Sequence, residues 1–412
     1  MLTGRDFIVF SDDWGRHPFS CQHIMQHFLA TNRILWVNTI GMRNPRFTAY
    51  DIKRSVEKIK GWLRPHKTNH KQLPDNLTIL SPFMLPYSNY AVVRERNKRS
   101  VLRSVKRVTD HLQFRHPIVL TTLPNAVDYV GELCERLSVY YCVDDFTHWP
   151  GVDSCLVTEM EEALLRKVDY VCASSEELCR KKARFGTTPK LLAHGVDNEH
   201  FHMPAGGELQ TVPRGTRRVI GFFGALSAWV DYGLLLKLAR MRPDWLFLLV
   251  GPVDTDVSIL TNIENIHLAG KIPYEDLPKV AESFDVALIP FVINDMTLSV
   301  NPLKLMEYLA CGLPVVSTPL PEVLKFSDLV YIADSVETFA QSVERALLED
   351  SPDLKQKRRE LASHYSWKSV AETFSAAVEQ AARTKECSSH EPHPHGKHRN
   401  SSNYSDRVPG EF

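Results

Sequence analysis

A lysine and a glutamate three positions apart, near the start of an apolar segment, are the residues best suited to chemistry. Asn and Pro favour a helix start, so Asn301 and Pro302 predict a helix over Asn301–Cys311 with Asn301 as its cap. Lys304 and Glu307 then share one helix face. A cation near a helix N-terminus meets a phosphate, and a carboxylate one turn on accepts both hydroxyls of a ribose. The alternative is a surface ion pair.

Two pairs of adjacent aspartates follow predicted strands in the first half of the chain. Asp144 and Asp145 follow Val139–Val143, and Asp12 and Asp13 follow the first strand. Neighbouring carboxylates repel each other, so one of Asp144 and Asp145 is expected to have a raised pKa that suits proton transfer. For both pairs the alternative is a local role, capping the next segment or supporting a loop.

Short apolar segments alternate with amphipathic ones along almost the whole chain. The strands expected in the first half are Phe7–Phe10, Ile34–Asn38, Leu77–Leu80, Ile118–Thr121, Val139–Val143, Tyr170–Ala173 and Lys190–Ala193. Those in the second half are Val219–Phe223, Leu246–Val250, Asn265–Leu268, Val286–Pro290, Val315–Thr318 and Val330–Ala333. The expected helices are Cys21–Ala30, Asn97–Leu112, Leu156–Lys167, Asp231–Arg240, Tyr274–Ser283, Asn301–Cys311, Val336–Glu349 and Trp367–Arg383. Because the strands are continuously apolar, we expect parallel sheets with helices on both faces.

A Gly- and Pro-rich segment, residues 203–215, separates the two series. We therefore predict an α/β protein of two Rossmann-like, doubly wound domains, residues 1–204 and 215–385, which face a central cleft. The last helix is long enough to pack back on the first domain. The tail, residues 386–412, is polar and rich in His, Ser and Pro, and we expect it to be disordered rather than to bind a metal.

Composition and charge exclude several classes of protein. The chain has 412 residues, with 49 Lys and Arg against 49 Asp and Glu, so no nucleic-acid partner is indicated. No apolar segment approaches the ~20 residues of a membrane span, and the N-terminus lacks the features of a signal peptide. The eight cysteines have no CxxC spacing and are expected to be reduced, buried thiols. These features indicate a cytoplasmic protein.

The sequence resembles the two-domain GT-B glycosyltransferases, specifically the retaining, nucleotide-sugar-dependent family called group 1 or family 4. Within that family it is most similar to members associated with teichuronic-acid and exopolysaccharide synthesis. The segments that carry the resemblance, over about residues 1–380, are Tyr140–Asp145, Ala173–Glu177, His194–Asp197, Gly221–Ala225, Leu249–Pro252, Gly270–Tyr274, Asp285–Pro290 and Asn301–Thr318. The Gly221–Gly224 turn itself fits either an approach of phosphate to the backbone or a tight strand connection.

The resemblance implies that the second domain binds a nucleotide-diphosphate sugar and that the first presents a glycan or lipid-linked acceptor. The implied donor-binding residues are Gly224, Ala225, Gly251, Lys271, Ile272, Asn301, Pro302, Leu303, Lys304 and Glu307. Asp144, where the family often has a His, and Lys304 are the implied catalytic residues. Asp12, Asp13 and Asp145 lie on the implied acceptor side. No Asp-x-Asp metal motif is evident among these implied site residues, so we expect a metal-independent enzyme without a further cofactor.

Two features depart from the family pattern. The family has two acidic residues eight apart at this helix; Glu307 matches the second, which binds the ribose, but Ser299 stands at the first. Ala225 and Val230 stand where an Arg and a Lys neutralise the diphosphate. Lys304 is expected to supply that charge instead, because an ammonium acts as a point cation toward phosphate.

Two basic segments, Arg46–Lys71 and Arg94–Arg107, lie in the first domain, and the first includes Lys53, Lys58 and Lys60. A basic face interleaved with apolar side chains favours contact with anionic lipid. A solvated helix surface is the alternative for the second segment. Nucleic-acid binding is a weaker third interpretation, because no nucleic-acid-binding motif accompanies the charge.

The sequence therefore predicts a cytoplasmic glycosyltransferase at the inner face of the membrane, acting in cell-surface or extracellular polysaccharide synthesis. The first alternative is a GT-B protein without transferase activity that binds a nucleotide or glycan, and it rests on Ser299 and the missing cations. The second is a Rossmann oxidoreductase, although no GxGxxG follows the first strand.

Overall fold

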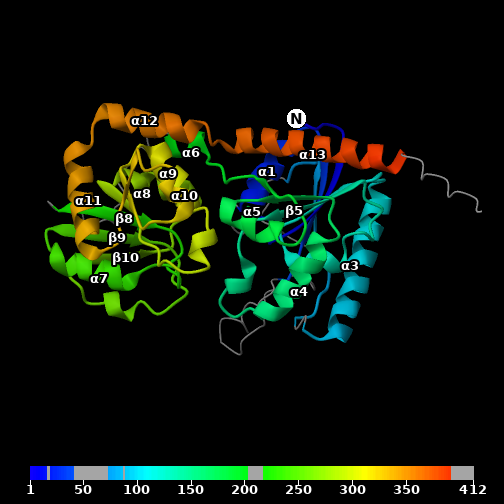
Figure 1. Ribbon diagram of the computed structural model, residues 1–412, viewed down its shortest axis with the longest axis horizontal. Helices are drawn as coiled ribbons and strands as arrows, with labels where there is room; N and C mark the ends of the chain where they lie inside the picture. Colours follow the sequence, from blue (N-terminus) through cyan, green and yellow to red (C-terminus); the bar gives the residue numbers. More distant parts are fainter. Residues whose placement is uncertain (16–18, 41–72, 87–88, 203–216, 391–412) are drawn as a thin grey trace, which may run out of the picture.

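The computed structural model describes residues 1–15, 19–40, 73–86, 89–202 and 217–390, which form two lobes lying side by side (Figure 1). Each lobe is built on one parallel β-sheet, seven-stranded in the first and six-stranded in the second. The prediction of two Rossmann-like α/β domains is confirmed. None of the described helices combines the length and apolar character that a membrane crossing requires. The basic segment Arg46–Lys71 and residues 391–412 of the tail lie outside the described residues.

The first sheet has the strand order β3-β2-β1-β4-β5-β6-β7. Its strands are β1 (Asp6–Ser11), β2 (Arg33–Asn38), β3 (Leu77–Leu80), β4 (Ile118–Thr121), β5 (Leu137–Cys142), β6 (Tyr170–Ala173) and β7 (Lys190–Leu191). The helices of this lobe are α1 (Ser20–Phe28), α3 (Ala91–His111), α4 (Ser154–Leu165) and α5 (Glu176–Ala183), and α6 (Asn198–His202) follows at the junction.

Both faces of the first sheet are covered, which explains why its strands are continuously apolar. Tyr141 of β5 belongs to the core on one face and Tyr140 to the core on the other, and both are fully buried. The first of these cores includes Phe28 of α1 and Phe374 from the end of the chain. Alternate residues of one strand therefore supply two separate cores.

The second sheet has the order β10-β9-β8-β11-β12-β13. Its strands are β8 (Arg218–Phe223), β9 (Trp245–Val250), β10 (Ile266–Gly270), β11 (Val286–Ile289), β12 (Val315–Ser317) and β13 (Val330–Ile332). The helices are α7 (Tyr232–Met241), α8 (Leu277–Glu282), α9 (Leu303–Cys311), α10 (Pro321–Leu324), α11 (Val336–Glu349), α12 (Pro352–Ser363) and α13 (Trp367–His390). Short 3₁₀ turns precede two of them, η4 (Tyr274–Asp276) before α8 and η5 (Thr297–Ser299) before α9.

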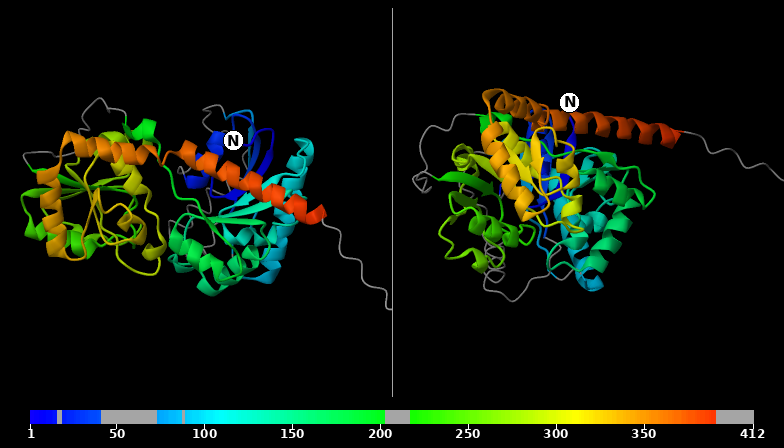
Figure 2. Two further views of the ribbon diagram at one scale, coloured as in Figure 1. Left: turned by 45° about the horizontal axis from the view of Figure 1, so that its top comes forward. Right: turned by 60° about the vertical axis from the view of Figure 1, so that its left-hand side comes forward.

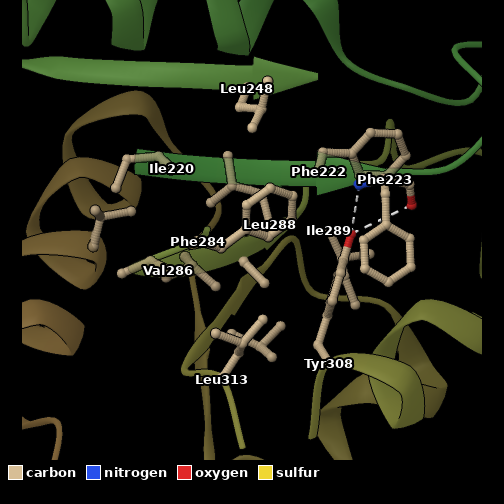
Figure 3. Close-up of a cluster of buried hydrophobic side chains, with 14 of the residues drawn as sticks. Ile220, Phe222, Phe223, Leu248, Phe284, Val286, Leu288, Ile289, Tyr308 and Leu313 are labelled. Carbon is tan, nitrogen blue, oxygen red and sulfur yellow. Dashed lines mark hydrogen bonds between the residues drawn. The ribbon is translucent and has the colours of Figure 1, made fainter. Parts of the chain in front are cut away.

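The buried Tyr308 fixes α9 against β8 (Figure 3). Its hydroxyl accepts a hydrogen bond from the Phe223 N–H at 2.9 Å and lies 3.4 Å from the Phe223 carbonyl oxygen. Gly221 lies within β8, where a Cβ would approach the ring of Phe284 to 2.1 Å. Close packing in the core therefore explains the first glycine of the Gly221–Gly224 turn, and no approach of phosphate is needed at that position.

The last helix, α13, crosses back onto the first lobe (Figures 1 and 2). Trp367, Phe374 and Val378 are buried in the same core as α1. At the junction the chain passes between the lobes twice, and Val196 forms a parallel β-bridge with Ser366. Helix α13 continues to His390, so the part of the predicted disordered tail before residue 391 is helical rather than disordered.

Several local expectations need correction. Helices α5 and α12 were not predicted, because their sequences are mostly charged or polar and contain few apolar residues. The predicted helix Tyr274–Ser283 begins as the η4 turn and becomes α-helical only at Leu277. The cysteines are all free, but only Cys21, Cys142 and Cys172 are buried, while Cys134, Cys155 and Cys387 are exposed.

Candidate functional site

The carboxyl ends of the two sheets hold most of the residues that the sequence singles out. The first sheet reverses its strand order between β1 and β4, and the second between β8 and β11. Such switch points leave a crevice at the carboxyl edge of a parallel sheet, where ligands bind. Asp12 follows β1 and Gly224 follows β8, so each lies at the switch point of its own sheet.

Gly224 and Gly251 lie at the ends of β8 and β9 in close contact. The Gly224 N–H donates to the Val250 carbonyl at 2.8 Å. Gly224 has φ +155° and Gly251 φ +149°, and a Cβ on Gly251 would lie 1.8 Å from the Gly224 carbonyl oxygen. Only glycine fits this contact. The neighbouring Ala225 is partly buried and carries no charge.

Lys304 and Glu307 of α9 lie beside this glycine contact. Their ion pair spans 2.8 Å, with the lysine side chain 23% exposed and the glutamate 9%. The Lys304 ammonium lies 5.0 Å from the centre of the Phe223 ring, and a Cβ on Gly224 would be 3.3 Å from Lys304 Cε. The alternative of a pair on an exposed helix face is therefore wrong, because the carboxylate is nearly buried.

The start of α9 differs from the expectation. Asn301 does not cap the helix; its side-chain amide donates to the Ser174 carbonyl of the first domain at 2.9 Å. Pro302 occupies the N-cap position, where no side chain accepts a hydrogen bond from the helix. Leu303 packs against the first-domain core that contains α1 and α13. The turn that begins α9 is therefore held by the opposite domain.

Lys271 and Ile272 follow β10, at the other rim of the second sheet. Lys271 is exposed, while Ile272 packs against the second-domain core. The nearby Tyr274 stacks on His200 with ring centres 4.5 Å apart, and burial followed by the charge of Glu307 raises its pKa. Tyr274 therefore lies within the electrostatic reach of Glu307 on α9.

Asp144 lies beyond β5 in the first domain, on the carboxyl edge that also carries Asp12. Burial, then the charges of Asp145 and Asp12, raises its pKa to about 7. Asp144 is partly buried, and its carboxylate has no hydrogen bond or ion pair with another described residue. It is therefore a carboxyl group that changes its protonation state near neutral pH. Asp12 and Asp13 are both partly buried, and the Asp12 carbonyl accepts from Trp36 Nε1 at 2.9 Å.

Asp145 is held by other side chains of the first domain. Its buried carboxylate accepts a hydrogen bond from Thr147 at 2.6 Å and pairs with Lys181 at 2.7 Å. Burial opposes ionisation, but the hydrogen bonds from Lys181 and Thr147 outweigh it and lower the pKa of Asp145 to about 2. His148 Nδ1 also lies 3.3 Å from this carboxylate, so three side chains of the first domain contact it, and its assignment to the acceptor side stays a prediction.

Lys181 is the main residue that the sequence analysis missed. It lies on α5 within a run of charged residues, and its partners are 36 to 118 positions away. No local pattern signals such a contact. Across the described segments, no group of three or more His, Cys, Asp and Glu side chains is arranged to hold a metal ion.

Comparison with known sequences identifies the second domain. Residues 217–350 match the family model of the Glycosyl transferases group 1. TuaH of Bacillus subtilis (strain 168), whose name assigns it provisionally to teichuronic acid biosynthesis as a glycosyltransferase, is 28% identical over 227 residues. That match covers 52% of this chain and 57% of TuaH, so the chain matches little more than half of its relative's length.

Comparison with solved structures extends to both domains. Sucrose-phosphate synthase from Thermosynechococcus elongatus is 14% identical with a TM-score of 0.69, and the match covers 92% of this chain and all of that one. HepE from Anabaena, solved with UDP, is 13% identical with a TM-score of 0.63, covering 91% of this chain and all of that one. A further HepE structure contains UDP-glucose, with a TM-score of 0.61, 13% identity and coverage of 93% and 99%. Residues 217–350 therefore match the group 1 glycosyl transferases, and the two domains together have the GT-B fold.

Proposed function

We propose that this protein transfers a sugar from a nucleotide-diphosphate sugar to a glycan or lipid-linked acceptor in the synthesis of a cell-surface or extracellular polysaccharide. The observation that carries the proposal is the nearly buried Lys304–Glu307 pair beside the Gly224–Gly251 contact, in a domain of the group 1 glycosyl transferases. TuaH supports the polysaccharide role, and the HepE structures with UDP and UDP-glucose support the class of donor.

In this proposal the second domain binds the donor through α9. Glu307 accepts the ribose hydroxyls, and Lys304 neutralises the diphosphate as it leaves. Glu307 pairs with Lys304 at 2.8 Å and so fixes the position of the ammonium before the donor binds. The diphosphate then interacts with an ammonium that is already in place. Asp144 of the first domain, with a pKa raised to about 7, accepts the proton of the acceptor hydroxyl. Retention of the anomeric configuration is implied by the family resemblance, and independence of metal is proposed because Lys304 would take the place of a divalent cation.

A panel of nucleotide sugars tests this function. Thermal unfolding of the full chain is measured with UDP-, GDP-, ADP- and dTDP-linked sugars, and release of the nucleoside diphosphate is then followed with the stabilising donor. We expect one donor class to raise Tm and to release its diphosphate when chelator is present. Loss of release with chelator would exclude metal independence, and no Tm shift with any donor would contradict the proposal.

A second candidate is a GT-B protein that binds a nucleotide or glycan without catalysis. The observation that favours it is the absence of the family's cations, since Ala225 is uncharged and Val230 is buried. The same panel separates the two candidates. A donor that raises Tm without hydrolysis or transfer would favour the binding protein.

We also propose that the first domain contacts anionic lipid at the inner face of the cytoplasmic membrane. Helix α3 carries four cations without an ion pair to another described residue: Arg96, Arg103, Lys106 and Arg107. Exposed apolar side chains lie next to it, with Phe83 46%, Tyr90 60% and Val92 81% exposed. In a β-α unit of a parallel sheet the helix starts at the carboxyl edge, so Tyr90 and Val92 lie on the edge that carries Asp144. A lipid-linked acceptor would approach from that side.

A further inference from the structure

Lys181 of the first domain contacts both domains through a single ammonium group. Its Nζ lies 2.7 Å from an Asp145 carboxylate oxygen of its own domain. It also donates to Ser299 Oγ at 2.8 Å and to the Asp295 carbonyl at 3.3 Å, both at the η5 turn of the second domain. An ammonium has three protons, so these three acceptors use its whole capacity.

Two further hydrogen bonds join the same two segments. Ser175 Oγ donates to the Ser299 carbonyl at 2.7 Å in a buried position, and Asn301 donates to the Ser174 carbonyl at 2.9 Å. Figure 1 shows α5, which carries Lys181, on the side of the first lobe that faces the second. The Lys181 contact is therefore part of a hydrogen-bonded interface between the two domains. We call this interface the η5 junction; it consists of residues 174–181 of the first domain and 295–301 of the second.

On each side, the η5 junction lies close in sequence to a residue that we assign to the proposed reaction. In the first domain, Asp145 directly follows Asp144. In the second domain, the η5 turn leads within a few residues into α9 and Lys304. The ammonium of Lys181 therefore links the two domains close in sequence to the groups that would act on donor and acceptor.

We propose that Lys181 is a positioning residue that holds the two domains in the closed arrangement required for transfer. The buried Asp145 carboxylate fixes the lysine in the first domain, and Ser299 and Asp295 are the groups that it engages when the domains close. Ser299, which departs from the family pattern, suits this contact, because its hydroxyl accepts from Lys181 without placing a second carboxylate beside Asp145. The inference rests on the proposed function only for its kinetic readout.

Closure by Lys181 predicts a specific kinetic effect. If only closed molecules bind donor productively, opening the domains raises the apparent dissociation constant by the inverse of the closed fraction. Saturating donor restores closure. Lys181→Met should therefore raise KM for the donor at least ~10-fold while kcat stays within about threefold, and Lys181→Arg should recover most of the change. A role confined to folding stability would lower Tm and leave KM unchanged.

The experiment compares Lys181→Met, Lys181→Arg and Ser299→Ala with the parent by small-angle scattering without donor and by donor kinetics. Ser299→Ala removes an acceptor in the second domain while the Lys181–Asp145 pair stays intact, so it tests closure even if Lys181→Met fails to fold. Lys279→Met, which breaks an i,i+3 pair with Asp276 inside the second domain, is the matched control. We expect a larger radius of gyration for Lys181→Met and Ser299→Ala but not for the control.

Scattering needs no catalytic activity, so it decides the inference even if no donor is found for the parent protein. An unchanged radius of gyration in every folded Lys181 and Ser299 variant would overturn it. An unchanged KM in Lys181→Met, with a parent that turns over, would overturn it as well.

Discussion

A Cβ atom on Gly251 would lie 1.8 Å from the carbonyl oxygen of Gly224. The two residues end adjacent strands, β8 and β9, and the Gly224 N–H donates to the Val250 carbonyl between them. The obstacle is backbone, which no side-chain rotation relieves. The close approach of the chain after β8 and after β9 therefore depends on the absence of a side chain at Gly251.

Gly251→Ala should destabilise the second domain by about 2–4 kcal/mol, because the methyl group forces β8 and β9 apart and alanine is strained at φ +149°. Chemical denaturation measures the loss. Gly233→Ala in α7 is the control, since its added Cβ meets only the Asp231 side chain at 3.3 Å, and it should change stability by no more than ~1 kcal/mol. Equal stability of the two variants would show that the strand ends relax freely.

Lys304→Met should lower kcat at least ~10²-fold, about 2.7 kcal/mol on the transition-state scale. The ammonium acts on charge that grows as the glycosidic bond breaks, so turnover suffers more than ground-state binding. Lys304→Arg should recover part of the activity. Steady-state kinetics measures the effect, and Lys279→Met controls for loss of an i,i+3 pair in the same domain. Turnover within threefold of the parent would favour the non-catalytic binding protein.

Glu307→Ala should weaken donor binding by roughly 1–3 kcal/mol, because two ribose hydroxyls lose their acceptor and Lys304 loses its partner. Glu307→Gln should lose less, since it keeps one acceptor. Calorimetric titration of the donor measures both values. Glu379→Ala, which breaks an exposed pair with Arg383 on α13, should leave donor affinity unchanged. If Glu307→Ala binds donor as tightly as the parent while folded, the carboxylate does not hold the ribose.

The raised pKa of Asp144 predicts that the stability of the protein depends on pH. Its pKa is raised from 3.8 to about 7, so the folded state keeps the proton that the unfolded state loses. Its contribution to stability is therefore complete below about pH 4 and is lost as the pH rises through 7. Asp144→Asn cannot ionise, so its stability relative to the parent should increase by about 1–2 kcal/mol between pH 4 and pH 8.

Thermal unfolding of the parent and Asp144→Asn across that pH range measures the difference. Asp110→Asn, at an exposed position of α3, serves as the control. If the difference in Tm between the parent and Asp144→Asn does not change with pH, the pKa of the Asp144 carboxyl group is not raised in the folded protein. The same variant should lose transfer activity at every pH if Asp144 accepts the proton.

Binding to lipid vesicles should depend on charge and on the tip of α3. The fraction of the protein that sediments with vesicles containing phosphatidylglycerol should exceed the fraction that sediments with vesicles of phosphatidylcholine alone. This fraction should fall as the salt concentration rises. Arg96→Gln with Arg103→Gln, or Val92→Asp, should reduce it, and so should neutralisation of Lys53, Lys58 and Lys60. Arg345→Gln on α11 of the second domain is the control. Equal recovery with neutral and anionic vesicles would remove the membrane proposal.

The strands and the outline of the fold could be predicted because β5 and β9 are buried on both faces and therefore continuously apolar. Helix α9 was also predictable, since Pro302 and Gly312 bracket it. Neither feature depends on distant contacts. The pattern of neighbouring residues was sufficient in both cases.

The roles of individual polar groups could not be predicted in the same way. Asn301 has the chemistry of a cap, yet it donates to Ser174, which is 127 positions away. Asp145 has the chemistry of a site residue, yet Lys181 and Thr147 engage it. In both cases a partner brought close by the packing of two domains decides the role, and no local sequence pattern contains that information.

The packing of α13 on the first domain has a consequence for biosynthesis. The second sheet is continuous in the chain from β8 to β13, and its core also needs Phe339 of α11 and Ala362 of α12, so that core can assemble before α13 has left the ribosome. The first sheet is synthesised earlier, but the core on one of its two faces stays open until Phe374 and Val378 emerge near the end of translation. The domain that is made first is therefore the one whose core is completed last.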